Sequence, residues 1–184
     1  MKKKVIVAID GPSSSGKSTI AKLVAKHFNF TYIDSGSIYR AITYLAIKNN
    51  LVKTDSIDIV SLIDLLNNCS ISFSFNSNNQ NIIKIDDVSI ENEIRTFEIS
   101  NNVSLIAEKN DIRKYVLKIQ KDISKNKSVV MDGRDIGSVV FPNADFKFFL
   151  DASLDVRALR RWNELKLIEK DLKFEEVKKD LSKR

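Results

Sequence analysis

Residues 5–19 read VIVAIDGPSSSGKST. The first five residues of this stretch are apolar, which predicts a short buried strand. A serine-rich turn follows, and from Lys17 onward the apolar residues have helical spacing. The turn matches the pattern G-x-x-x-x-G-K-[ST] from Gly11 to Ser18, in the strand–loop–helix context that a phosphate-cradling loop requires. The sequence therefore predicts that the chain binds a nucleoside triphosphate.

The parts of this loop have distinct expected roles. Gly11 and Gly16 allow backbone conformations that a side chain would block, so the N–H groups of the loop can point inward onto phosphate oxygens. Lys17 is expected to reach the β- and γ-phosphates of ATP, and the Ser18 hydroxyl to ligate Mg²⁺. The helix that begins near Lys17 adds the positive end of its dipole. The predicted ATP-binding residues are Gly11, Pro12, Ser13, Ser14, Ser15, Gly16, Lys17, Ser18 and Thr19.

The composition is that of an ordinary globular protein. The chain has 184 residues, of which 43% are hydrophobic and 29% charged, and this length suffices for one domain with a sizeable core. No apolar run approaches the length of a membrane span, and the run after Lys4 is too short for a signal peptide. The single cysteine, Cys69, permits no internal disulfide. We therefore expect a cytoplasmic protein that does not bind membranes.

The positive charge of the chain has more than one explanation. A net charge of +6 is compatible with a nucleic-acid partner, with acidic small molecules, or with solubility alone. Most lysines fall on predicted exposed helix faces, whereas several arginines occur in short motifs. Because arginine binds phosphate in a bidentate manner, this distribution favours a site for several phosphates. The sequence lacks the interleaved aromatic residues and reader motifs of nucleic-acid-binding modules, so no nucleic-acid partner is expected.

Four short apolar segments predict the buried strands of a parallel sheet. They comprise residues 5–9, 30–33, 128–131 and 146–150. Ligands of such sheets bind at the carboxyl ends of the strands. Asp132 directly follows the third segment, where phosphate-loop proteins place a second carboxylate that organises Mg²⁺.

The helix after the second strand is expected to place further candidate ligand-binding residues at the carboxyl edge of the sheet. Ser37 is its expected N-cap, which places Tyr39 and Arg40 in its first turn, close to the carboxyl end of the second strand. The later segment 67–95 instead alternates polar and apolar residues between polar turns, which predicts a small antiparallel β insert. The expected division is a core of residues 1–66 and 96–184, with residues 67–95 inserted.

Three arginines lie together on one predicted helix near the C-terminal end. Arg157, Arg160 and Arg161 have the spacing i, i+3, i+4 and so share one side of the helix. Adjacent guanidiniums repel one another unless an anion lies among them, and a transferred phosphate group would be such an anion. A purely structural role would require carboxylate partners instead.

The residue types alone do not decide whether the phosphoryl acceptor is a hydroxyl or a phosphate. A hydroxyl acceptor needs a base, but the only histidine, His27, lies at the end of the first helix. A phosphate monoester ionises for the second time near pH ~6 and needs no base, only cations that bring two anions together. The many arginines favour a nucleotide acceptor, while Asp34 and Asp135 remain possible bases for a hydroxyl.

Several motifs give the chain a resemblance to a known family. They are IDGPSSSGKST (9–19), DSGSIYRA (34–41), ENEIRTFEIS (91–100), MDGRDIGSVVFPNAD (131–145), and KFFLDAS with RALRR (147–161). Together they resemble the bacterial cytidylate kinases, which are P-loop nucleoside-monophosphate kinases acting on CMP and dCMP. The resemblance implies an α/β, P-loop NTPase-like fold with a parallel sheet flanked by helices. It also implies ATP and CMP or dCMP as substrates, with Mg²⁺ bound to ATP.

The resemblance assigns further residues to the site. Ser104, Arg113 and Asp135 match residues that hold the cytosine ring, and Arg40 and Arg134 match residues that grip the CMP phosphate, with Ser35 and Tyr39 nearby. The lid over the ATP phosphates matches a helix near 154–184, and the β insert matches the monophosphate-binding region. The expected catalytic residues are Lys17, Asp132, Arg134, Arg157, Arg160 and Arg161, the expected Mg²⁺ ligands are Ser18 and Asp132, and Arg184 aligns with a lid arginine used on the acceptor.

Members of this family continue past the position of Arg184. We therefore expect an incomplete lid and core, a four-stranded sheet with an exposed edge, and weak or absent turnover. A monomer is expected, with self-association through that edge if the chain is truncated. Two alternatives stay open: a hydroxyl kinase of the same architecture with Asp34 as its base, and an inactive nucleotide-binding subunit.

Overall fold

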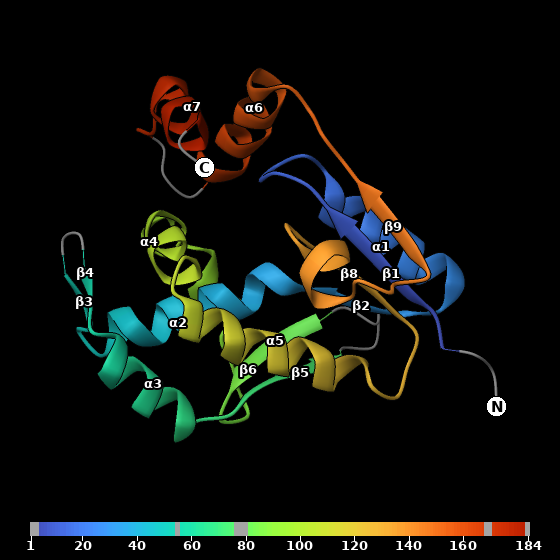
Figure 1. Cartoon of the computed structure of the whole chain (residues 1–184). Helices are drawn as coiled ribbons and strands as arrows, with labels where there is room; N and C mark the ends of the chain where they lie inside the picture. Colours follow the sequence, from blue (N-terminus) through green and yellow to red (C-terminus); the bar gives the residue numbers. More distant parts are fainter. Residues whose placement is uncertain (1–3, 54–55, 76–80, 168–170, 183–184) are drawn as a thin grey trace.

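A computed structural model describes residues 4–53, 56–75, 81–167 and 171–182. Its central feature is a parallel sheet of four strands in the order β2-β8-β1-β9 (Figure 1). The strands are β1 (Ile6–Asp10), β2 (Thr31–Asp34), β8 (Val129–Gly133) and β9 (Phe146–Phe149). They confirm the predicted parallel sheet, with bounds shifted by one or two residues. In the register, Asp132 lies beside both Ile9 and Asp34, so the carboxyl ends of β1, β2 and β8 meet at one edge of the sheet.

Alternation along the strands explains why both faces of the sheet are covered. Val7 and Ile9 of β1 pack against Ala21 and Ala25 of α1 (Lys17–Phe28) on one face. Ala8 points the other way and packs with neighbours that include η2 (Ile136–Val140), a π-helical turn. Because successive side chains of a strand face opposite ways, two apolar layers form around one sheet.

The other α-helices follow α1 along the chain. They are α2 (Ser35–Lys48), α3 (Ile59–Asn67), α4 (Phe97–Ala107), α5 (Asn110–Ser124), α6 (Leu154–Leu165) and α7 (Phe174–Ser182). The largest apolar cluster joins α2 to α3, α4, α5 and the β insert, with Ile38, Leu62, Ile83 and Ile106 fully buried. This cluster fixes α2 relative to the insert. Within the described residues no helix has the length and apolar character to cross a bilayer.

The insert is antiparallel, as its alternating pattern predicts. Strands β5 (Ile71–Phe75), β6 (Asn81–Ile85) and β7 (Val88–Ser89) form one sheet, and the 3₁₀ turn η1 (Glu93–Arg95) leads from it into α4. A separate short pair, β3 (Val52–Lys53) and β4 (Ser56–Ile57), lies between α2 and α3 in the chain. The division of the chain into a core and an insert at residues 67 and 95 stays a prediction.

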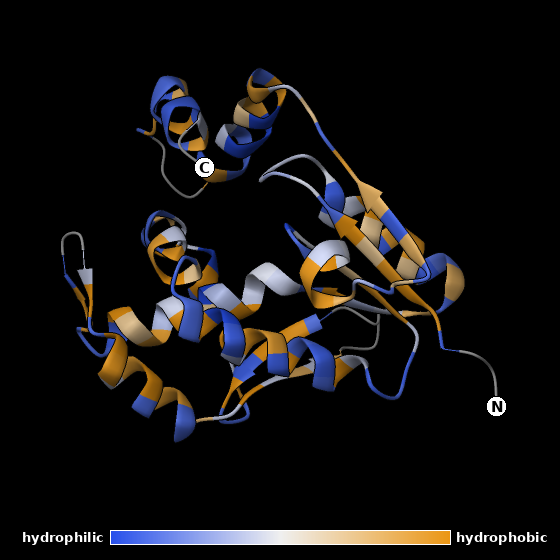
Figure 2. Cartoon of the chain, in the orientation of Figure 1, coloured by the Kyte–Doolittle hydropathy of each residue, from blue (hydrophilic) through white to orange (hydrophobic). Residues whose placement is uncertain are grey.

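Helices α6 and α7 pack against each other away from the central sheet (Figure 1). Both alternate hydrophobic and hydrophilic residues along their length (Figure 2). Their apolar sides form a cluster of Ala158, Leu165, Val177 and Leu181, which Phe97 of α4 joins. The expected lid region is therefore attached to α4 as well as to β9.

Two local predictions are wrong. The segment 146–150 was expected to be buried, but Phe146, Phe148 and Phe149 are each more than half exposed; β9 is one of the two edge strands and pairs with β1 alone among the described strands. The N-cap of α2 is Asp34, not Ser37. The Asp34 carboxylate accepts a hydrogen bond from the Ser37 N–H at 3.2 Å, and the helix begins earlier as a result.

Candidate active site

The loop between β1 and α1 depends on two glycines. A Cβ atom on Gly11 would lie 2.1 Å from the carbonyl oxygen of Leu150, so only glycine allows this approach of loop and sheet. Gly16, with φ +97°, is the N-cap of α1, and no side chain caps the helix start. Its first N–H groups therefore face the loop interior, where an anion is favoured by the helix dipole.

Some polar groups inside the loop have fewer hydrogen-bond partners than they can have. The Lys17 ammonium donates to the Pro12 carbonyl at 3.0 Å. Burial lowers the pKa of Lys17; Arg134 and Arg40 add to this, while Asp132 and Asp34 oppose it. The Ser15 hydroxyl is buried and has no hydrogen-bond partner among the described residues. A polyphosphate would satisfy these groups, since each of its oxygens accepts hydrogen bonds.

Asp132 occupies the carboxyl end of β8 and is almost fully buried, at 2% exposure. The Ser18 hydroxyl donates to its Oδ2 at 2.7 Å, and the Tyr32 hydroxyl donates to its Oδ1 at 2.8 Å. Burial raises the pKa of Asp132 to about 6, and the nearby Asp34 charge adds to the rise. No pattern among the residues indicated the Tyr32 contact, because a tyrosine in an apolar strand is usually a packing residue.

The pair Ser18 and Asp132 fits Mg²⁺. A hydroxyl and a carboxylate oxygen lie side by side, and Mg²⁺ prefers such oxygen ligands. Mg²⁺ usually takes only one or two protein ligands and completes its shell with water and phosphate oxygens. No group of three or more His, Cys, Asp or Glu side chains gathers in the described part of the chain, which is compatible with this mode of binding.

A cavity of about 360 Å³ extends from the loop across the carboxyl edge of the sheet. Lys17, Arg40 and Arg134 all line it, as does Asp132. Helix α4 forms its far wall. The other predicted residues that line it are Ser13, Ser18, Ser35, Tyr39, Ser104, Arg113, Asp135 and Arg161. One cavity therefore brings together three of the residues expected for the triphosphate, Ser13, Lys17 and Ser18, and most of those expected for the acceptor.

The part of this cavity next to α5 contains an ion pair. Arg113 of α5 donates to the carboxylate of Asp135, and Tyr39 lies nearby, where burial raises its pKa. Asp10, which sequence reasoning missed, supports this part: its carboxylate accepts from the N–H groups of Ile136 and Gly137 at 2.7 and 2.8 Å. The position of Asp10 at the end of β1 was the available signal.

The three arginines of α6 do not share one partner. Arg157 donates to the carbonyls of Ala152 and Ser13, and Arg160 donates to the carbonyl of Ser15 at 2.9 Å. Arg161 reaches across the cavity to the Ser100 hydroxyl of α4 at 2.6 Å and pairs with Glu164.

Two of these arginines therefore bind the carbonyls of the phosphate loop itself. Eight of the predicted residues do not line this cavity: Gly11, Pro12, Ser14, Ser15, Gly16, Thr19, Arg157 and Arg160. Arg184 lies outside the described residues.

A parallel sheet with a phosphate loop, a buried Asp beside the loop and a cavity lined by cations defines an α/β nucleotide kinase. The chain belongs to the cytidylate kinase family: the family model with the description "Cytidylate kinase" matches residues 7–184. The chain is accordingly a nucleoside-monophosphate kinase by family.

Relatives named cytidylate kinase match nearly the whole chain. The protein of Streptococcus pneumoniae serotype 19F (strain G54) is 46% identical over 184 residues, which cover 99% of this chain and 80% of that protein. The protein of Flavobacterium johnsoniae is 42% identical over 183 residues, with the same coverage. The solved structure "Crystal structure of TT1252 from Thermus thermophilus" covers 96% of this chain and 78% of its own, at 16% identity and a TM-score of 0.39.

Proposed function

We propose that the chain transfers the γ-phosphoryl group of ATP to CMP or dCMP, giving ADP and CDP or dCDP. The observation that carries this proposal is that Lys17, Arg40 and Arg134 line one cavity. ATP phosphates fit the uncapped start of α1, and an acceptor phosphate fits the arginine side of the same cavity. The names of the relatives support cytidine as the acceptor nucleoside.

The residues suit transfer between two anions. An oxygen of the acceptor phosphate forms a bond to the γ-phosphorus as the bond from that phosphorus to the leaving oxygen of ADP breaks. The cations Lys17, Arg40 and Arg134 reduce the repulsion between the two nucleotides and stabilise charge in the transition state. Mg²⁺, held by Ser18 and Asp132, would neutralise phosphate charge when bound.

The hydroxyl-kinase alternative needs a base, and Asp34 is poorly suited to this role. Burial by itself would raise the pKa of Asp34, but the charges of Arg40 and Arg95 and the N–H of Ser37 hold it below its usual value. A general base works best when its pKa lies near the operating pH. The surroundings of Asp34 therefore favour a phosphate acceptor, which needs no base.

Asp135 is the proposed reader of the base. A carboxylate accepts a hydrogen bond from the exocyclic amine of cytosine and repels the carbonyl that uracil has at the same position. The ion pair with Arg113 limits the rotation of the Asp135 carboxylate. Selection of CMP over UMP follows from this contact.

ADP release with CMP, UMP or AMP as acceptor tests the proposal. Lys17→Ala should abolish transfer to every acceptor, whereas Lys22→Ala, an exposed position on the same helix, should leave it unchanged. Asp135→Asn should narrow the preference for CMP over UMP by about tenfold, the value of one good hydrogen bond to a base. Equal rates with CMP and UMP in the unaltered chain, or unchanged selectivity in Asp135→Asn, would contradict the assignment.

A further inference from the structure

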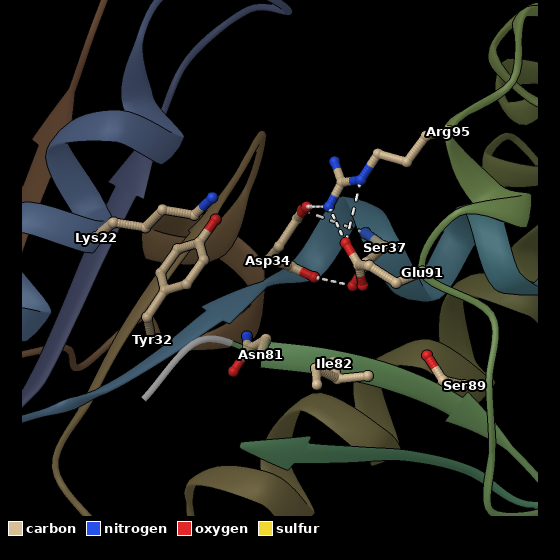
Figure 3. Close-up of a pocket in the computed structure, with 9 residues that line it drawn as sticks. All are labelled: Lys22, Tyr32, Asp34, Ser37, Asn81, Ile82, Ser89, Glu91 and Arg95. Atoms are coloured by element: carbon tan, nitrogen blue, oxygen red, sulfur yellow. Dashed lines mark hydrogen bonds and ion pairs between the residues drawn. The ribbon is translucent and has the colours of Figure 1, made fainter. Parts of the chain in front are cut away.

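A second cavity lies on the other side of Asp34 from the active site. It has a volume of about 330 Å³, and Figure 3 shows its lining residues. These are Lys22, Tyr32, Asp34, Ser37, Asn81, Ile82, Ser89, Glu91 and Arg95. Among the described residues that line this cavity, only Asp34 also lines the active-site cavity. Asp34 is therefore the wall between the two.

A chain of alternating charges runs through this wall. Glu91 Oε1 lies 2.5 Å from Arg95 Nη2 and accepts from Arg95 Nε at 3.1 Å. Arg95 Nη2 lies 3.8 Å from Asp34 Oδ2, and Arg40 Nη1 lies 3.5 Å from the same oxygen on the active-site side. In Figure 3 the guanidinium of Arg95 lies between the carboxylates of Glu91 and Asp34.

The outer end of this chain is anchored to the insert. The second carboxylate oxygen of Glu91 accepts from the backbone N–H of Ile83 in β6 at 3.4 Å. Ile94, next to Arg95, is fully buried in the apolar cluster that contains α2. The backbone of η1 is thus fixed against α2, and the Arg95 side chain reaches Asp34 from a rigid base.

The Asp34 carboxylate makes two contacts on the active-site side of the wall. Its Oδ1 caps α2 through the Ser37 N–H, and its Oδ2 faces Arg40. The Asp34 side chain is only 15% exposed, so its charge must be balanced by neighbouring cations. If Arg40 alone balanced it, Asp34 would compete with an acceptor phosphate for the Arg40 guanidinium. A second guanidinium on Asp34 reduces that competition.

We infer that Arg95 is a positioning residue for the acceptor: by pairing with Asp34 from behind, it leaves Arg40 available to bind the acceptor phosphate. Arg95 itself does not line the active-site cavity, so its effect passes through Asp34. The inference rests on the proposed function, because it takes the monophosphate of CMP as the ligand of Arg40.

Isothermal titration calorimetry with CMP as the titrant tests this without requiring turnover. Arg95→Met should weaken CMP binding by about tenfold, while the affinity for ATP changes less than about twofold. Arg95→Lys, which keeps the charge, should restore most of the CMP affinity. The matched control is Lys22→Met: this cation lines the same cavity, but its ammonium lies over the Tyr32 ring, 5.6 Å from the ring centre, and its removal should change neither affinity.

A double-mutant cycle separates this role from a merely structural one. Asp34→Asn keeps a capping side chain at the start of α2 but removes the charge that Arg95 and Arg40 share. In that background Arg95→Met should change CMP affinity by less than about twofold, because the two residues act as one unit. An equally large effect in both backgrounds would overturn the inference. If Arg95→Met does not fold, Glu91→Gln takes its place in the cycle and should weaken CMP binding in the same direction.

Binding of CMP to the unaltered chain separates a failure of the proposed function from a failure of the role inferred for Arg95. An unaltered chain that binds no CMP overturns the proposed function and, with it, this inference. An unaltered chain that binds CMP, together with an Arg95→Met variant that binds it equally well, overturns the inference alone.

Discussion

The carboxylate of Asp132 is a charged group that is almost completely buried. Two hydroxyls, from Ser18 and Tyr32, donate to its two oxygens, yet burial still raises its pKa to about 6. Hydrogen bonds favour the charged form and desolvation opposes it, and here desolvation is the larger effect. A cation at this position would remove the cost of the buried charge.

Because of this raised pKa, we expect the free energy of unfolding of the metal-free chain to depend on pH. Between pH ~4 and ~6 the native state keeps the proton of Asp132 while the unfolded chain loses it, so the stability contribution of this group falls as pH rises. Without metal, Asp132→Asn should therefore be more stable than the unaltered chain by about 1–3 kcal/mol near pH ~7.5, and the difference should vanish near pH ~4.

Urea unfolding of both proteins in the presence of a chelator measures this difference. Asp64→Asn, at an exposed position of α3, is the control and should show no such change with pH. A loss of stability in Asp132→Asn near neutral pH would show that the carboxylate is not under electrostatic strain.

At the scale of elements, the phosphate loop is held from two sides. Its start passes the backbone of Leu150 after β9, and its carbonyls accept hydrogen bonds from Arg157 and Arg160 of α6. The loop motif could be recognised from sequence, whereas its carbonyl contacts with α6 could not, because backbone partners leave no pattern in the side chains. The expected cluster of three arginines around one anion is thus distributed over several contacts.

The approach of Gly11 to Leu150 predicts a steric penalty. In Gly11→Ala the new Cβ would meet a backbone oxygen at 2.1 Å, so the loop or the end of β9 must move. We expect a loss of about 2–4 kcal/mol in unfolding free energy, the range for overpacking with backbone strain. Gly36→Ala is the control. Its Cβ would meet the ends of the Asp34 and Arg40 side chains, at 3.1 Å and 3.6 Å, and no backbone atom is among its nearest neighbours, so stability should change by less than about 1 kcal/mol. Equal losses in urea unfolding would contradict this account.

At the scale of the whole molecule, the sheet has an exposed edge strand, β9. Phe146, Phe148 and Phe149 of β9 are exposed, and among the described residues no strand pairs with the outer side of β9. An edge with unpaired backbone groups and apolar side chains favours pairing with another copy of the chain.

This edge predicts self-association of the 184-residue chain. Phe148→Lys should shift the chain toward monomer, because a charge on an edge strand opposes pairing. Leu167→Lys is the control: Leu167 is 81% exposed but follows α6 and lies on no strand. Sedimentation velocity at increasing concentration measures the effect, and monomers at every concentration in the unaltered chain would contradict it.

Elements whose patterns are local could be predicted from the amino-acid sequence. Strand–loop–helix order, the parallel sheet, the β insert and the family follow from short motifs and hydrophobic periodicity, since these depend on neighbours along the chain. Which side chains meet could be seen only in the packed fold. Tyr32 contacts Asp132 across 100 residues, and Asp34 lies between Arg40 and Arg95. The physical reason is that burial and charge depend on packing between distant segments, which the order of residues specifies only through the complete fold.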